Sequence, residues 1–172
     1  MHGRNLFAAA PTRTTTDAQP VVRNDPPGIT TNNPGNLETL PRGEWRGQIG
    51  TRAVQGRVRG FAIFDTPENG LRALGVNIIS QQRLHGRNTV GGLIERFAPA
   101  TDGNPTAGYA GFVARYIGVG VNDEVDFTDP EILQQTIEAI IMFENGAEYA
   151  QHYTRQQIEA GVNSAIDYHQ DR

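Results

Sequence analysis

The chain has 172 residues, a length that suits one compact domain with an adequate core and does not suit two. It contains 15 basic and 19 acidic residues, whereas a nucleic-acid-binding domain typically has an excess of basic residues. There is no Cys, which excludes disulfides and thiolate metal sites, and no apolar run is long enough to span a membrane.

Residues 1–27 are rich in Thr, Pro, Ala and Arg and show no hydrophobic period. This composition predicts an extended N-terminal arm, followed by a single domain over residues 28–172. Leu6 and Phe7 form a small apolar cluster with which the arm would dock on a partner. A disordered tail is the alternative.

Charge is unevenly placed along the chain. Residues 1–60 hold eight Arg and four acidic residues, which leaves seven Arg and fifteen acidic residues for the rest. Such an asymmetry can orient a molecule on a partner surface.

Residues 32–36, with the sequence NNPGN, have the composition of a turn. Residues 60–65 are typical of a short strand, which would pair with residues 46–51 in a small hairpin. Trp45, the single Trp, lies in this polar region. It is either a platform that stacks on a sugar or peptide, or a cap over the hydrophobic core.

From Thr66 onward the pattern predicts five amphipathic helices, over residues 67–85, 90–97, 109–117, 133–145 and 155–168. Thr66 followed by Pro67 is a helix start, and Asn88 is expected to cap the second helix. Capping-box spacing occurs at Thr128-Asp129-Pro130-Glu131 and at Thr154-Arg155-Gln156-Gln157. Gly86 and Gly118 or Gly120 would end the first and third helices.

Glu144 occupies the apolar stripe of the fourth predicted helix. Leu133, Ile137, Ile140 and Ile141 precede it at helical spacing, and Gly146 follows as a stop. Desolvation of a carboxyl on such a face raises its pKa. A carboxyl that stays protonated near neutral pH is the general acid that glycoside cleavage requires. The alternative is a Glu at a fraying helix end that turns out to solvent.

The four His residues show no ligand-like spacing, so neither a metal site nor a cofactor is expected. No second carboxylate is clearly placed beside Glu144. Glu68 and Asp102 are the candidates for that role.

Several short motifs follow one another in a definite order between about residue 28 and residue 161. They are NNPGNL (32–37), WRG (45–47), FDTPENGLRA (64–73), IERFAP (94–99), Tyr109 and ENG (144–146). In this order the chain resembles a family of virion-associated structural proteins of tailed phages and prophages. The resemblance implies a place in the phage particle, among other virion proteins that the arm would contact.

A second resemblance is to the lysozyme-like superfamily. In glucosaminidases and lytic transglycosylases a Glu-bearing helix precedes an Asn-rich segment and a Trp-x-Gly hairpin, whereas here the Glu-bearing helix comes last. The order is similar to that of a circularly permuted lysozyme-like domain. It implies a mainly helical α+β fold of about five helices with a small hairpin.

Together these patterns predict a virion protein that degrades peptidoglycan by cutting glycan strands at the host cell wall during DNA entry. Glu144 would protonate the glycosidic oxygen. Asn33, Asn36, Trp45 and Tyr109 would line the substrate cleft. The alternative is a non-catalytic structural component of the tail or capsid, in an oligomeric assembly, that uses the same scaffold. A bacterial wall-binding protein outside phages is a third interpretation.

Overall fold

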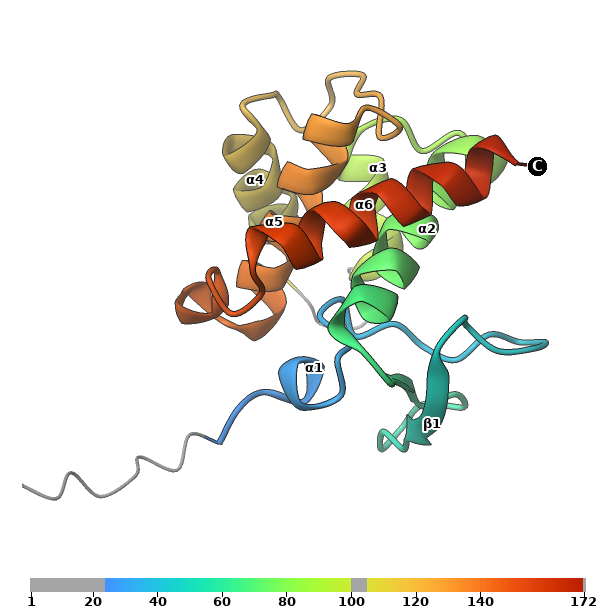
Figure 1. The fold of residues 1–172 in the computed structure, drawn as a ribbon. Helices are drawn as coiled ribbons and strands as arrows, with labels where there is room; N and C mark the ends of the chain where they lie inside the picture. Colours follow the sequence, from blue (N-terminus) through green and yellow to red (C-terminus); the bar gives the residue numbers. More distant parts are fainter. Residues whose placement is uncertain (1–23, 100–104, 172) are drawn as a thin grey trace, which may run out of the picture.

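The computed structural model describes residues 24–99 and 105–171, so the predictions for Leu6, Phe7 and Asp102 lie outside the described residues. The described chain is mainly helical with one two-stranded hairpin, as predicted (Figure 1). Its elements are α1 (Pro27–Thr30), β1 (Gln48–Arg52), β2 (Phe61–Phe64), α2 (Pro67–His85), α3 (Val90–Phe97), α4 (Thr106–Ile117), α5 (Pro130–Asn145), a 3-10 turn η2 (Ala147–Tyr149) and α6 (Arg155–Gln170).

The five predicted helices are confirmed, and local signals explain where they begin and end. The Thr66 hydroxyl accepts a hydrogen bond from the Asn69 N–H, and Pro67 opens α2. Gly86 and Gly118 end α2 and α4 in the left-handed conformation, at φ 65° and 86°. Thr154 and Gln157 form the predicted capping box at the start of α6.

Two predicted caps are wrong by one residue. Thr89, not Asn88, caps α3 by accepting from the Gly92 N–H at 3.0 Å. Asp129, not Thr128, caps α5 and accepts from the first free N–H groups at 2.9 and 3.1 Å. In each case the residue directly before the first helical position has a side-chain oxygen that can cap the helix. This oxygen lies closer to the free N–H groups of the first turn than the side chain of the preceding residue does.

Helix α2 packs closely against α6 and also contacts α3, α5 and β2 (Figure 1). Small residues allow this close approach. A Cβ added to Gly161 of α6 would lie 2.6 Å from the Leu71 Cβ, and one added to Gly75 of α2 would lie 2.7 Å from the Ala165 Cβ. Backbone proximity therefore depends on glycine at both crossing points.

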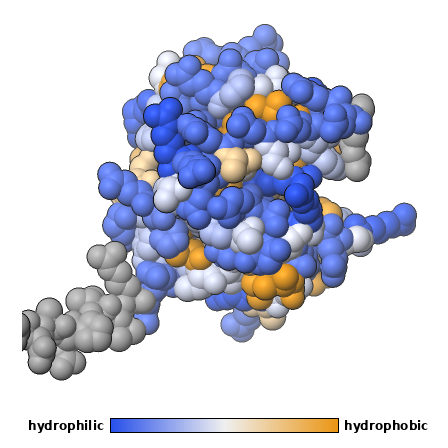
Figure 2. Space-filling view, viewed as in Figure 1, coloured by the Kyte–Doolittle hydropathy of each residue, from blue (hydrophilic) through white to orange (hydrophobic). Residues whose placement is uncertain are grey.

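One continuous core joins α2 to the other helices and to the hairpin. Its largest fully buried members include Phe64, Leu71, Ile78, Leu93, Phe127 and Ile137. Hydrophobic surface shows only as separate patches on the face drawn in Figure 2. Within residues 24–99 and 105–171, no helix combines the length and apolar character that a membrane crossing requires.

The hairpin pairs β1 with β2 in antiparallel register, with an irregularity between Gln48 and Gly50. The pairing confirms the strand predicted at residues 60–65 and its partner. Helix α1 and the 3-10 turn have no counterpart in the sequence-based prediction. Asp25, within the predicted arm, accepts a hydrogen bond from the Tyr149 hydroxyl at 2.8 Å, so the end of that segment contacts the domain.

We predict that Gly161→Ala destabilises the fold by about 1–3 kcal/mol, because the added methyl group must displace Leu71 from a packed core. The matched control is Gly111→Ala in α4, where the nearest neighbouring atom is the flexible end of Arg115. This variant should gain about 0.5–1 kcal/mol from helix propensity. Urea unfolding of both variants measures the difference. Equal stability of the two would show that the α2–α6 crossing tolerates a wider spacing.

Candidate active site

The Asn-rich turn is a rigid loop held by its own side chains. Asn32 and Asn36 adopt left-handed φ angles of 52° and 49°, which Asn tolerates better than most residues. The Asn33 side chain donates to the carbonyls of Leu37 and Ala62 at 2.9 Å and accepts from the Leu37 N–H at 2.8 Å. The loop is thereby fixed to β2.

Glycines bring the neighbouring helices against this loop. A Cβ at Gly70 of α2 would collide with the Asn32 carbonyl, and a Cβ at Gly28 would collide with the Asn145 side chain. Asn145 in turn donates to the Pro34 carbonyl at 3.0 Å. The loop is therefore clamped between α1, α2 and the end of α5.

Glu144 lies in the last turn of α5 and faces this loop. Asn36 Nδ2 donates to Glu144 Oε2 at 3.0 Å, and the Tyr109 hydroxyl donates to Glu144 Oε1 at 2.9 Å. Leu133 and Ile137 on the same stripe are fully buried. The helical stripe thus carries the carboxyl inward, beside the loop, and each of its oxygens has one protein donor.

Burial raises the pKa of the Glu144 carboxyl above its usual value of 4.5. The hydrogen bonds from Asn36 and Tyr109, and the charge of Arg57, oppose this shift. Burial dominates, so a larger share of the carboxyl is protonated at mildly acidic and neutral pH than in a solvent-exposed Glu.

Tyr109 is a fixed neutral donor. Its side chain is 1% exposed and stacks on Phe143, with ring centroids 3.8 Å apart and planes 9° from parallel. Burial, together with the neighbouring Glu144, raises the pKa of the Tyr109 hydroxyl well above its usual value. The phenol therefore keeps its proton and orients the carboxyl.

Two hollows adjoin at this point, because they share the lining residues Gly35, Asn36, Arg57 and Phe97. The first, which we call the acid end, measures about 190 Å³ and contains Glu144 and Tyr109. The second, which we call the arginine end, measures about 220 Å³ and contains Trp45, Glu38, Arg59 and Arg96. Together they form one groove across the loop.

The groove brings together Glu144, Asn36, Tyr109 and Trp45 from the predicted set, but not Asn33. Asn33 is 1% exposed, and its side-chain amide forms hydrogen bonds with backbone groups. It therefore holds the loop and does not line either hollow. Turn composition does not reveal which Asn points into the core. Glu68 also lies outside both hollows.

The position of Trp45 is compatible with either of its two predicted roles, as a cap over the core or as a stacking platform. It packs partly buried against the core and also lines the arginine end. Its indole N–H donates to the Glu38 carbonyl at 2.9 Å, which fixes the ring. One face of a rigid aromatic ring beside a polar groove is suited to sugar stacking.

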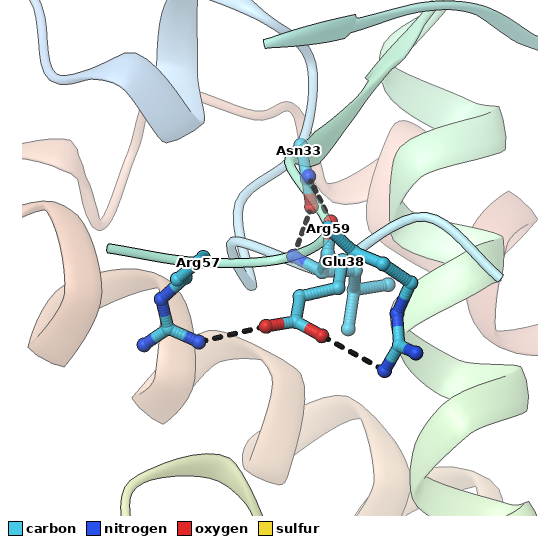
Figure 3. Close-up of polar contacts among 5 residues, drawn as sticks. Asn33, Glu38, Arg57 and Arg59 are labelled. Carbon is cyan, nitrogen blue, oxygen red and sulfur yellow. Dashed lines mark hydrogen bonds and ion pairs between the residues drawn. The ribbon is translucent and has the colours of Figure 1, made fainter. Parts of the chain in front are cut away.

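An ion-pair cluster in the groove was missed by the sequence reasoning. Glu38 binds Arg57 at 2.8 Å through one oxygen and Arg59 at 3.1 Å through the other (Figure 3). Both arginines lie on the connection between β1 and β2. The excess of Arg in residues 1–60 was the available signal, but only the hairpin brings these arginines to one carboxylate.

Among the described residues, no three His, Asp or Glu side chains gather as a metal site requires. The chemistry available in the groove is that of the Glu144 carboxyl, fixed amide and phenol donors, and the arginines paired with Glu38.

We predict that Glu144→Gln stabilises the folded protein at pH 7, because Gln is neutral, keeps an acceptor oxygen for Asn36 and can donate its amide N–H to the Tyr109 hydroxyl oxygen. A carboxyl with a raised folded pKa contributes its full stability below the unfolded value of 4.5 and loses it as pH rises through the folded pKa. The advantage of the variant should therefore shrink as pH falls toward 4.5. Melting temperatures between pH 4 and 8 test this, with the exposed Glu95→Gln as control. A variant less stable than wild type at pH 7 would contradict the burial argument.

No protein-family model matches the chain. Protein P5 of Pseudoalteromonas phage PM2 is similar to it, with 32% identity over 138 residues that cover 78% of this chain and 78% of the relative. The similarity spans most of both proteins, which supports the phage setting that the sequence motifs indicate. The chain therefore belongs to the same family as this phage protein.

Proposed function

We propose that the protein is a virion-associated enzyme that cuts the glycan strands of peptidoglycan, with Glu144 as its general acid. The observation that carries this proposal is the environment of Glu144. The Glu144 carboxyl lies at the acid end of the groove, has a raised pKa, and is oriented by Asn36 and Tyr109. That is what proton donation to a glycosidic oxygen requires.

The reaction begins when the protonated Glu144 carboxyl gives its proton to the glycosidic oxygen as the carbon–oxygen bond breaks. The sugar left behind carries developing positive charge at its anomeric carbon. Glu144, now a carboxylate, accepts a proton from the nucleophile that attacks this carbon. The nucleophile is either water or the 6-hydroxyl of the same sugar.

The groove favours a mechanism with a single acid, because the other carboxylate in its described lining is held in ion pairs. Glu38 is the other carboxylate among the described residues that line it, and Arg57 and Arg59 occupy both of its oxygens. Glu38 is thus poorly placed to serve as a free nucleophile or base. A mechanism in which Glu144 serves first as acid and then as base needs no second carboxylate.

A lysozyme-like domain is part of the same proposal. A central buried helix, a small hairpin at one side of a groove, and a Glu at the end of a helix agree with that architecture. Here the Glu follows the hairpin in sequence, as a circular permutation requires. Fold alone would not establish activity, so the assignment rests on the groove.

We predict that purified protein clears peptidoglycan in a gel, and that Glu144→Gln lowers the rate at least about 100-fold, because it removes the transferable proton. Glu95→Gln should retain activity. Mass spectrometry of the released fragments separates the two nucleophiles, since water gives reducing ends and the 6-hydroxyl gives anhydro-sugar ends. Full activity of Glu144→Gln would remove Glu144 from the mechanism.

A purely structural virion role is the second candidate. It is favoured by the fact that both oxygens of Glu144 are already bonded within the protein, as in a carboxylate that serves only to hold the loop. In that case wild type and Glu144→Gln would both lack activity, and Asn36→Ala, which removes a bond between the loop and α5, would lower stability alone.

In either role we propose that the N-terminal arm serves assembly into the particle. Residues 1–23 have no period that could bury a face, so they add little to the stability of the domain. Deleting them, while keeping Asp25, should shift the melting temperature by less than about 2 °C. The same deletion should stop incorporation into virions, as measured by the protein content of purified particles. A large loss of stability, or normal incorporation, would contradict this assignment.

A further inference from the structure

We propose that the arginine end of the groove is an anion subsite, in which Arg57, Arg59 and Arg96 bind a carboxylate carried by the muramic acid branch of the glycan strand. This inference rests on the proposed function, because it names what part of the same substrate the second hollow recognises. It assigns a role to three side chains that the acid chemistry does not use.

The described lining of this hollow is strongly cationic. Arg57, Arg59 and Arg96 face it, and Glu38 is the only acidic residue among its described lining residues. Glu38 binds one nitrogen of Arg57 and one of Arg59, which leaves further guanidinium donors on each. Arg96 is exposed and, within the described part of the chain, has no ion-pair partner.

The ligand follows from the chemistry of the lining. Guanidinium groups recognise carboxylates through paired N–H donors, and Trp45 in the same hollow offers a ring face for a sugar. In peptidoglycan every second sugar carries a lactyl group, whose carboxylate is either free or joined to a stem peptide that has carboxylates of its own. A strand lying along the groove would present such a group beside the sugar that it stacks on Trp45.

Arg57 links this subsite to the acid. It lines both hollows, and its guanidinium lies over the Phe61 ring at 5.4 Å from the centroid. Its charge holds the pKa of Glu144 lower than burial alone would. A carboxylate bound beside Arg57 in addition to Glu38 would weaken this effect and raise the pKa of Glu144 further.

Glu38 acts in this scheme as an internal substitute for the ligand. It holds Arg57 and Arg59 together when the groove is empty and competes with a substrate carboxylate for them. Removing its charge should therefore strengthen ligand binding. A merely structural Glu38 would predict the opposite or no change.

The test measures binding by calorimetry in the Glu144→Gln background, so that no ligand is cleaved. Three soluble tetrasaccharides serve as probes: one of N-acetylglucosamine alone, one with free lactyl carboxylates, and one with stem peptides attached. We expect a carboxylate-bearing probe to bind at least about 5-fold more tightly than the uncharged one. Whichever of the two charged probes binds more tightly identifies the source of the carboxylate.

Three further substitutions are added to this background. Arg96→Gln should weaken binding of the charged probe about 3- to 5-fold and leave the uncharged probe unchanged. Arg115→Gln, the same charge change outside both hollows, should have no effect. Glu38→Gln should tighten binding of the charged probe, and the affinity of all charged complexes should fall with added salt.

Equal binding of the three probes, equal effects of Arg96→Gln and Arg115→Gln, or no binding of any probe would overturn the anion subsite. The outcome is separate from that of the proposed function. Charge-selective binding with an inactive wild-type protein would retain the subsite and reject the enzyme. Cleavage by wild type without charge selectivity would do the reverse.

Discussion

The geometry of the site depends on the hydrogen bonds of the buried Asn33 side-chain amide. A loop that enters the interior must have its backbone polar groups satisfied, and Asn33 does this for the chain at Leu37 and Ala62. Gly70 then allows α2 to press directly on the loop. With the loop fixed in this way, Asn36 has one direction in which to point, and Glu144 lies there. Rigid support of this kind is what a functional side chain needs to hold its geometry.

The burial of Glu144 has an energetic cost and alters its protonation. The stripe of α5 that carries Leu133, Ile137 and Ile141 into the core also draws the carboxyl away from water. Donors on both oxygens reduce the resulting penalty but do not remove it, since burial remains the larger effect on its pKa. Structures often retain such locally unfavourable groups at functional sites, where the altered protonation is useful.

Much of the fold was predictable from sequence because its signals are local. Periodic apolar residues and Thr66, Gly86 and Thr154 fix the helices, and the stripe ending in Glu144 indicated its inward direction. The single-turn helix α1 was not predicted, because four residues are too few to show a hydrophobic period. The inward direction of the Asn33 side chain was not predictable, because a turn motif does not specify side-chain direction.

The polar partners in the groove were only partly predictable, for a related reason. Asn36 and Tyr109 were expected to line a cleft, yet their bonds to Glu144 come from tertiary geometry. Arg57 and Arg59 were missed altogether, because the connection between β1 and β2 has neither the period of a helix nor that of a strand. Glu38 was missed because it lies in an irregular segment before β1 and meets these arginines only in the folded chain. The role of residues in such loops depends on which side chains the surrounding scaffold places opposite them.

The bond between Asn36 and Glu144 also has a consequence for the timing of synthesis, because it joins residues 108 positions apart. The loop and hairpin leave the ribosome long before α5 does, and closing so long a segment is a late event for a folding chain. A chain that stops before α5 lacks Glu144, Phe143 and the core residues of α5, so it cannot complete the acid end of the groove. The complete groove, with its carboxyl in place, is therefore a property of the finished chain alone.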